Sequence, residues 1–120
     1  MREFKKSLKC ACRGLQYMVK RERNFRIELV IAFLVLILML VFKVKNWEAI
    51  ILVLIMALVI AAELVNTVLE RVVDILKPRI HPYARLIKDI MAAVVLVSSL
   101  AAIIIGVIIF LPYFYNLLER

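Results

Sequence analysis

Three observations predict that this chain is an all-α membrane protein with an N-terminal amphipathic surface helix and three transmembrane helices. Hydrophobic residue types make up 66% of its 120 residues, whereas soluble domains average roughly 45–50%. Three long blocks, 29–42, 49–62 and 90–111, contain no charged residue. The third block has the roughly 20 residues that a spanning helix needs, and the other two reach that length by including their flanks. We expect a single domain over residues 1–120.

The surface helix is expected over residues 3–21. Apolar residues recur there at spacings of four and three, while most Lys and Arg residues fall elsewhere on the helix. Such a basic amphipathic helix lies in the interface plane of a membrane. The segment that joins this helix to the first span either continues the helix or interrupts it. The residues of the apolar side are Phe4, Leu8, Cys12, Leu15 and Val19.

The first transmembrane helix is expected over about residues 27–44, after a charged segment that runs from Arg21 to Glu28. The arginines of this segment are explained either by anchoring at the membrane edge or by a role in a site. Its two acids, Glu22 and Glu28, are not explained by anchoring, because acidic residues contribute little to membrane orientation. Glu28 also stands at the threshold of the apolar block, where an ionisable residue indicates function.

The second transmembrane helix is expected over about residues 47–77, because no helix-breaking residue interrupts this stretch. Its connection to the first helix, 43–46, is short, so the two helices are antiparallel neighbours. At about 100° per residue, the polar residues of its C-terminal half fall within an arc of roughly 100° and form one polar stripe. The stripe consists of Glu63, Asn66, Thr67, Glu70 and Asp74.

The polar stripe predicts a functional site that faces away from lipid. A carboxylate near bilayer depth costs at least a few kcal/mol unless it is paired, faces a polar cavity or holds a cation. Like charges on one helix face also repel, which predicts a positive group between or opposite them. For Asn66 and Thr67 the alternative is that they hold helices together by hydrogen bonds. A three-span monomer offers little cover for the stripe, so we also expect an oligomer.

The acids of the stripe are expected near the inner membrane surface. With about 1.5 Å of rise per residue, Glu63 lies about 24 Å along the helix from Trp47, which marks the outer surface. Glu70 lies about 34 Å and Asp74 about 40 Å from the same residue. Glu63 is therefore expected near the inner headgroups, with the other two acids in water. This arrangement suits an encounter between a lipid and a water-soluble, metal-bound substrate.

The third transmembrane helix is expected over about residues 88–115. The connection before it, 77–85, includes a helix-ending proline and His81, the one histidine of the sequence. We interpret His81 as structural because it has no partner at helical spacing. Lys88 is either a site cation or a snorkelling membrane anchor. Asp89 is expected in the first helical turn, where an acid suits the helix dipole.

The distribution of Lys and Arg predicts a cytoplasmic N-terminus. Nine of the 17 lie in residues 1–26 and five in 71–89, against two in 43–46 and one at Arg120. Because positive residues are retained inside, the N-terminus and the second connection belong in the cytoplasm and the C-terminus lies outside. Topology and attraction to anionic lipid explain the net charge of +8, so no nucleic-acid partner is expected.

Several classes of chemistry are excluded by composition. The two glycines of the sequence form no phosphate-binding loop, and one His with two Cys supplies no nucleophile triad. Cys10 and Cys12 are expected to be free thiols, because no second cysteine pair or nearby histidine completes a zinc site. Any nucleotide must then be held by metal-bound carboxylates and basic side chains.

Two motifs occur together in the second half of the chain: Glu63-x-x-Asn66-Thr67-x-x-Glu70-x-x-Val73-Asp74 and Lys88-Asp89-x-x-Ala92-Ala93-Val94. They resemble the signature of the prokaryotic diacylglycerol kinase family, the small membrane kinases that include undecaprenol kinase. The likeness runs from about Phe4 to Pro112. Glu28 matches the acid of the diacylglycerol kinase branch, whereas the undecaprenol kinase branch usually has His there. The segments that resemble the undecaprenol kinase branch are Glu22-Arg23-Asn24-Phe25-Arg26-Ile27 and His81-Pro82.

The resemblance implies a homotrimeric bundle in the bacterial inner membrane that uses ATP with Mg²⁺ at its cytoplasmic face. By position, Glu63 matches the general base on the lipid hydroxyl. Glu22 and Glu70 match the pair that holds the metal and the ATP phosphates. Asn66 and Lys88 match positions close to those phosphates. The remaining acidic positions at the nucleotide site and its edge are Asp74, Asp89 and Glu28.

The leading hypothesis is an ATP- and Mg²⁺-dependent kinase for a membrane lipid alcohol, with undecaprenol preferred over diacylglycerol. Phosphoryl transfer needs a cation, a positioned hydroxyl and a proton acceptor, which carboxylates on one helix stripe beside a lysine supply. One alternative is a transporter subunit whose acids couple to a cation, which predicts carboxylates near the bilayer midplane. The other is a non-enzymatic assembly protein that uses the stripe as an interface.

Overall fold

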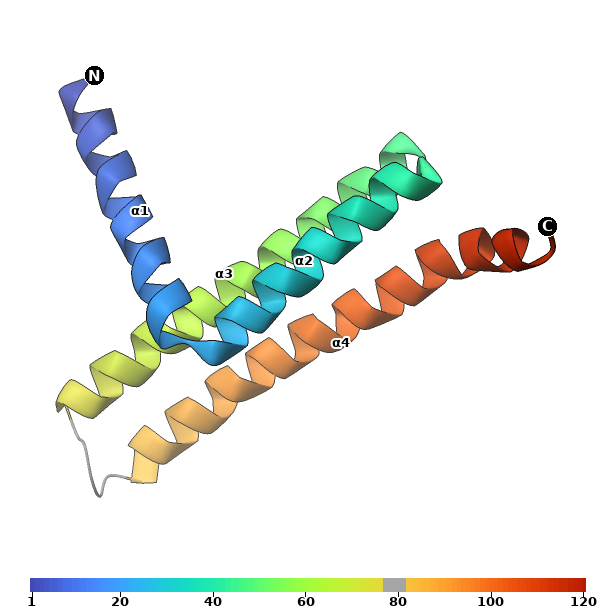
Figure 1. The fold of residues 1–120 in the computed structure, drawn as a ribbon. Helices are drawn as coiled ribbons and strands as arrows, with labels where there is room; N and C mark the ends of the chain where they lie inside the picture. Colours follow the sequence, from blue (N-terminus) through green and yellow to red (C-terminus); the bar gives the residue numbers. More distant parts are fainter. Residues whose placement is uncertain (77–81) are drawn as a thin grey trace.

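The computed structural model describes residues 1–76 and 82–120, and the secondary structure of these two ranges is helical (Figure 1). The all-α class predicted from the sequence is confirmed. Most of the predicted connection, His81 included, falls on residues 77–81 and lies outside the described residues. The helices are α1 (Arg2–Arg21), α2 (Arg23–Phe42), α3 (Asn46–Leu76) and α4 (Pro82–Leu118).

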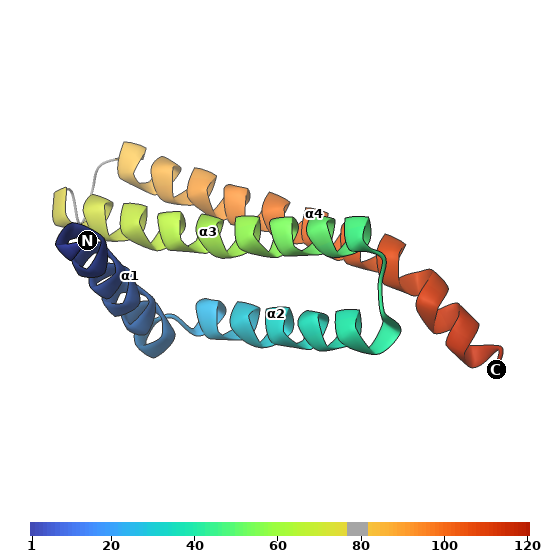
Figure 2. The same cartoon turned by 90° about the horizontal axis from the view of Figure 1, so that it is seen from above.

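α1 and α2 are separate helices that meet in a corner at Glu22. The backbone of Glu22 is extended (φ −111°, ψ 112°), so the surface helix does not continue into the span. The Arg26 guanidinium donates to the carbonyl oxygens of Val19 and Lys20, at 2.8 and 3.1 Å, which the end of α1 leaves without intrahelical partners. Phe25 fills the corner and is 1% exposed. α1 therefore leaves the bundle at a steep angle (Figures 1 and 2).

α2 and α3 form an antiparallel hairpin with a tight turn. Lys43 takes the left-handed conformation (φ 51°, ψ 55°) and ends α2. The backbone N–H of Val44 then donates to the carbonyl oxygen of Met39 at 3.3 Å. At the start of α3, the Glu48 carboxylate accepts from the backbone N–H of Lys45 at 3.0 Å. These contacts satisfy the backbone groups that two helix ends leave unpaired.

α3 is the central helix of the bundle. It packs mainly against α4 and less extensively against α2, and Figure 2 shows it lying between the two. The hydrophobic cluster nearest the α2–α3 turn has Leu52, Ile109 and Phe110 as its buried centre. The Phe42 ring at the end of α2 joins it, with ring centroids 6.3 Å from Phe110 and 4.9 Å from Phe114. Aromatic packing thus joins α2 to α4 at the turn end of the bundle, and Leu52 brings α3 into the same cluster.

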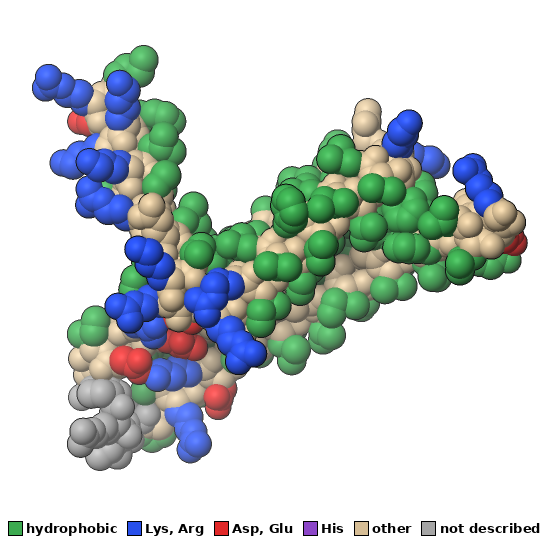
Figure 3. Space-filling model, in the orientation of Figure 1, with side chains coloured by type: hydrophobic (Ala, Val, Ile, Leu, Met, Phe, Trp, Pro, Cys, Tyr) green, Lys and Arg blue, Asp and Glu red, His purple; other side chains and the backbone are tan. Residues whose placement is uncertain are grey.

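Large hydrophobic side chains cover the outside of the three long helices (Figure 3). Leu40, for example, is 79% exposed and Ile108 is 66% exposed. Burial in a hydrocarbon phase, and not in a protein core, accounts for such a surface. α2, α3 and α4 are each long and apolar enough to cross a membrane, as the sequence predicts.

α4 starts at Pro82, earlier than the expected start of the third span. Proline suits the first helical position, because it has no N–H to pair and its φ angle is already helical. Asp89 therefore lies in the second turn, and the expectation that it lies in the first turn is wrong. Farther along, the buried Ser98 hydroxyl donates to the carbonyl oxygen of Val94 at 2.8 Å. The helix continues through Pro112.

Candidate active site

The candidate site lies at the corner end of the bundle, where Glu22 and the start of α2 meet the C-terminal half of α3. Figure 3 shows acidic and basic side chains gathered at this end, whereas hydrophobic side chains cover most of the length of the bundle. Each element brings acids there for its own local reason. The break after α1 places Glu22, the first turns of α2 carry Glu28, and α3 presents its polar stripe.

Glu63 is the buried centre of this acidic group. It is 3% exposed, as is Thr67 one turn away on α3. Its carboxylate is repelled by those of Glu22 and Glu70, and Glu28 on α2 is repelled in turn by Glu63. The fold therefore brings together four predicted site acids from three segments. Because one chain already covers Glu63 and Thr67, burial of these two residues does not require the oligomer that the sequence suggested.

Three buried oxygen atoms around this group lack a hydrogen-bond partner among the described residues. They belong to Glu28 (Oε2), Asn66 (Oδ1) and Thr67 (Oγ1). The Asn66 amide nitrogen donates to Glu70 at 3.4 Å, so only its oxygen is left unpaired. An unsatisfied buried oxygen costs roughly 1–3 kcal/mol, and three together indicate that a ligand or water completes the site.

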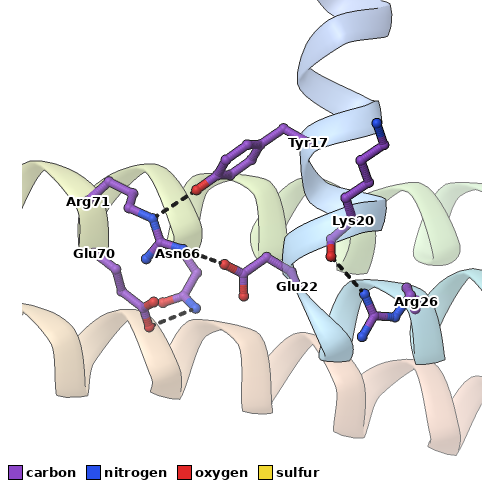
Figure 4. A network of polar contacts seen from close by, with 7 residues as sticks. All are labelled: Tyr17, Lys20, Glu22, Arg26, Asn66, Glu70 and Arg71. Carbon is purple, nitrogen blue, oxygen red and sulfur yellow. Dashed lines mark hydrogen bonds and ion pairs between the residues drawn. The ribbon is translucent and has the colours of Figure 1, made fainter.

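Arg71 supplies the positive group that the sequence led us to expect opposite the acids. Its Nη2 atom lies 2.8 Å from Glu22 Oε1, and its Nε atom donates to the Tyr17 hydroxyl at 3.2 Å. Figure 4 shows Tyr17 and Glu22 reaching from α1 and the corner toward Arg71 on α3, with Glu70 and Asn66 nearby. Sequence reasoning missed Arg71 and Tyr17. One signal was present, because Arg71 is the sole Lys or Arg in residues 49–76.

Lys88 and Asp74 form a second pair, between α4 and the last turns of α3. Lys88 Nζ lies 2.5 Å from Asp74 Oδ1, and both side chains are about half exposed. The structure thus joins two predicted site residues across two helices. Among the described residues, no hydrogen bond connects this pair to Glu22 or Glu70. Asp89 is exposed and makes no hydrogen bond or ion pair with the described part of the chain.

The donor set at the corner end fits a metal that is shared with a substrate. In residues 1–76 and 82–120, no group of three or more His, Cys, Asp or Glu side chains is arranged to hold a metal ion. Mg²⁺, however, commonly binds one or two carboxylates and completes its shell with water and substrate phosphates. Glu22 and Glu70, both partly buried beside Glu63, supply that number of oxygen ligands.

Apolar cavities lead along the bundle to the acidic group. One cavity of about 390 Å³ lies between α2, α3 and α4 and is lined by hydrophobic residues and Gly106. A second, of about 150 Å³, shares four of the same lining residues and has Glu28 and Ser99 in its wall. Both cavities suit a hydrocarbon chain. The polar end of the second cavity lies at Glu28, which interacts electrostatically with Glu63. The residues shared by the two cavities are Ile31, Met56, Ala102 and Ile103.

Three apolar helices with acidic side chains gathered at one end are the features of a small integral-membrane protein with a polar site at one end. Comparison with known proteins gives its family. The family described as "Prokaryotic diacylglycerol kinase" matches residues 9–110. The chain belongs to this family and is a lipid kinase.

Two relatives cover almost the same part of the chain. An undecaprenol kinase of Bacillus subtilis (strain 168) is 35% identical over 112 residues, which is 93% of this chain and 91% of that protein. A diacylglycerol kinase of Synechocystis sp. (strain ATCC 27184 / PCC 6803 / Kazusa) is 33% identical over 113 residues, which is 93% of this chain and 65% of that protein. The resemblance expected from the two motifs is confirmed.

Proposed function

We propose that this protein transfers the terminal phosphoryl group of ATP to the hydroxyl of a membrane lipid alcohol, with undecaprenol preferred and diacylglycerol as the alternative. The observation that carries the proposal is the position of Glu63. This buried carboxylate interacts electrostatically with the partly exposed acids Glu22 and Glu70 and with Glu28, which lies in the wall of an apolar cavity. A nucleotide from water and a lipid from the bilayer can meet there.

The residues of the site divide the work of phosphoryl transfer. Glu63 accepts the proton of the lipid hydroxyl, as a general base must do at the point of attack. Glu22 and Glu70 hold Mg²⁺ together with the ATP phosphates, and Mg²⁺ supplies neutralisation of the phosphate charge when it is bound. Asn66 contributes its unpaired amide oxygen beside them. Farther from the acids, the Asp74–Lys88 pair brings the lysine that meets the phosphates, and Asp89 lies at the edge.

The lipid acceptor is proposed to lie with its chain in the apolar cavities and its hydroxyl near Glu28 and Glu63. Glu28 lines the polar end of the cavity beside that hydroxyl, whose single proton goes to Glu63, and its Oε2 atom has no hydrogen-bond partner among the described residues. Undecaprenol is preferred because the undecaprenol kinase relative is matched over 91% of its length, whereas the diacylglycerol kinase relative is matched over 65%. The acid at position 28 is the feature that keeps diacylglycerol as the alternative.

The proposed setting is the bacterial inner membrane, with the N-terminus, α1 and the active site on the cytoplasmic side. The excess of Lys and Arg in residues 1–26 supports this orientation, and the amphipathic character of α1 supports its place at the membrane surface. The family resemblance supports a homotrimer and a single kinase domain over residues 1–120. The exposed apolar surfaces of α2, α3 and α4 leave ample area for contacts between subunits.

A two-acceptor assay tests the proposed function. Purified protein in detergent micelles receives Mg²⁺ and labelled ATP, and undecaprenol and diacylglycerol are offered separately. We expect faster transfer to undecaprenol, and a loss of roughly 100-fold or more in kcat for Glu63→Gln, the scale of a general base. Faster transfer to diacylglycerol would reverse the order of acceptors and make Glu28 the residue to study. Wild-type transfer rates in Glu63→Gln would refute the catalytic assignment.

A further inference from the structure

Arg71 is positioned at the proposed nucleotide site but takes no part in the proposed phosphoryl transfer. It lies on α3 directly after Glu70, and its side chain extends to Glu22 and Tyr17 (Figure 4). It is also attracted electrostatically by Glu70. The guanidinium therefore lies in the field of both carboxylates that are proposed to hold Mg²⁺ and the phosphates. Among the described residues, it is Arg71 that forms an ion pair with Glu22.

The Arg71 ion pair is easily exchanged. Its side chain is 46% exposed, and an ion pair in contact with water contributes little to stability because solvent screens it. Only Nε and Nη2 are engaged, and Nη1 has no hydrogen-bond partner among the described residues. Part of the guanidinium is thus available for a ligand while the side chain stays in place.

The charge balance of the site changes when a metal–nucleotide complex enters. A cation that binds Glu22 and Glu70 competes with Arg71 for the same oxygen atoms. The triphosphate brings an excess of negative charge that needs a new partner at the same place. A guanidinium binds phosphate oxygens in a two-pronged geometry, and Arg71 is the sole Lys or Arg in residues 49–76. If Arg71 exchanges Glu22 for a phosphate oxygen, Glu22 is left to bind the cation and the triphosphate gains a positive partner.

The geometry points to Arg71 as a nucleotide-binding residue, whose guanidinium pairs with Glu22 in the free protein and moves to the phosphate oxygens of ATP when the nucleotide binds. Tyr17 holds the Nε edge of the guanidinium, so the movement is a change of partner at its outer nitrogens. This inference deepens the proposed function and rests on it, because it requires a nucleotide at the corner end.

Nucleotide binding, measured without turnover, tests this role. A non-hydrolysable ATP analogue with Mg²⁺ is titrated into the purified full chain, and its dissociation constant is compared between wild type and variants. Loss of charge-assisted hydrogen bonds to phosphate in Arg71→Ala is expected to weaken binding by about 10-fold or more. Arg71→Lys keeps the charge but loses the two-pronged geometry, and its dissociation constant is expected to lie between those of wild type and Arg71→Ala. In turnover assays the KM for ATP should rise while the KM for the lipid does not change.

The matched control is Arg85→Ala, which removes an exposed arginine from the first turn of α4. It should bind the analogue as wild type does. If Arg71→Ala and Arg71→Lys bind the analogue as tightly as wild type, Arg71 only ties α3 to α1 and the inference is wrong. These measurements distinguish failure of the proposed function from failure of the proposed role of Arg71. A wild-type protein that neither binds the analogue nor phosphorylates a lipid refutes the proposed function, whereas one that does both while Arg71→Ala binds normally refutes the role of Arg71 alone.

Discussion

Two buried glutamates on α3 show how residue type alone does not define a site. Glu48 and Glu63 are 8% and 3% exposed. Glu48, near the α2–α3 turn, accepts hydrogen bonds from the Lys45 backbone N–H and the Tyr113 hydroxyl. Glu63, near the corner, has no hydrogen-bond donor among the described residues and is surrounded by other acids. The first is a structural group held by two donors, and the second is a carboxylate without a donor in the described part of the chain and is suited to chemistry.

These two residues give a matched pair of variants. We expect Glu48→Ala to lower the free energy of unfolding by roughly 1–3 kcal/mol, because two donors lose their acceptor, while kcat stays near wild type. We expect Glu63→Gln to leave stability unchanged or raise it, because removal of one charge relieves repulsion, while kcat falls. Thermal unfolding in detergent and lipid phosphorylation measure the two effects. A Glu63→Gln protein that unfolds more readily and stays active would assign Glu63 to structure.

At the scale of elements, the short connections decide where the helices lead. The extended residue Glu22 turns the chain out of α1 and sends α2 along α3. The left-handed residue Lys43 reverses the chain between α2 and α3. Neither connection contains glycine. Hydrogen bonds from side chains and from the backbone hold both of them. Of the two, Lys43 carries the conformational penalty, because a side chain disfavours the left-handed region.

Lys43→Gly is therefore expected to stabilise the hairpin, by up to about 1 kcal/mol. Glycine adopts the left-handed conformation without that penalty. The control is Lys45→Gly in the same turn, where no left-handed backbone occurs and added chain flexibility is expected to lower stability. Unfolding followed by the helical signal in detergent compares them. Greater stability in the Lys45 variant than in the Lys43 variant would contradict the assignment.

At the scale of the whole molecule, the end that carries the acids is proposed to face the cytoplasm together with α1. The two cysteines of the chain, Cys10 and Cys12, are both free and exposed on α1, so the native protein carries its own probe of orientation. The other end of the chain finishes at Arg120, beyond α4.

A membrane-impermeant thiol reagent is expected to label the wild-type protein in inverted vesicles and not in intact, right-side-out ones. The reason is the concentration of Lys and Arg before α2, which holds this end inside. The control is Arg120→Cys in a background with Cys10→Ser and Cys12→Ser, which should show the opposite pattern. Labelling of the native cysteines from outside would reverse the proposed topology.

Much of this protein follows from its sequence because hydropathy, helical periodicity and positive charge are local properties. They predict the all-α class, the three apolar helices and the surface helix, and the spacing from Glu63 to Asp74 resembles the family that the comparisons confirm. The sequence predicts one polar stripe because residues three and four apart share a helix face whatever the helix packs against.

The tertiary structure decided what that face meets. The pairing of Arg71 with Glu22 joins residues 49 positions apart, and it depends on the corner after α1, whose extended backbone no periodicity encodes. The burial of Glu63 within one chain depends on what the other helices place against that face of α3. The difference between Glu48 and Glu63 depends on whether a donor from another helix arrives. Contacts between helices depend on connection geometry and packing together, and this is why they emerge only once the chain is folded.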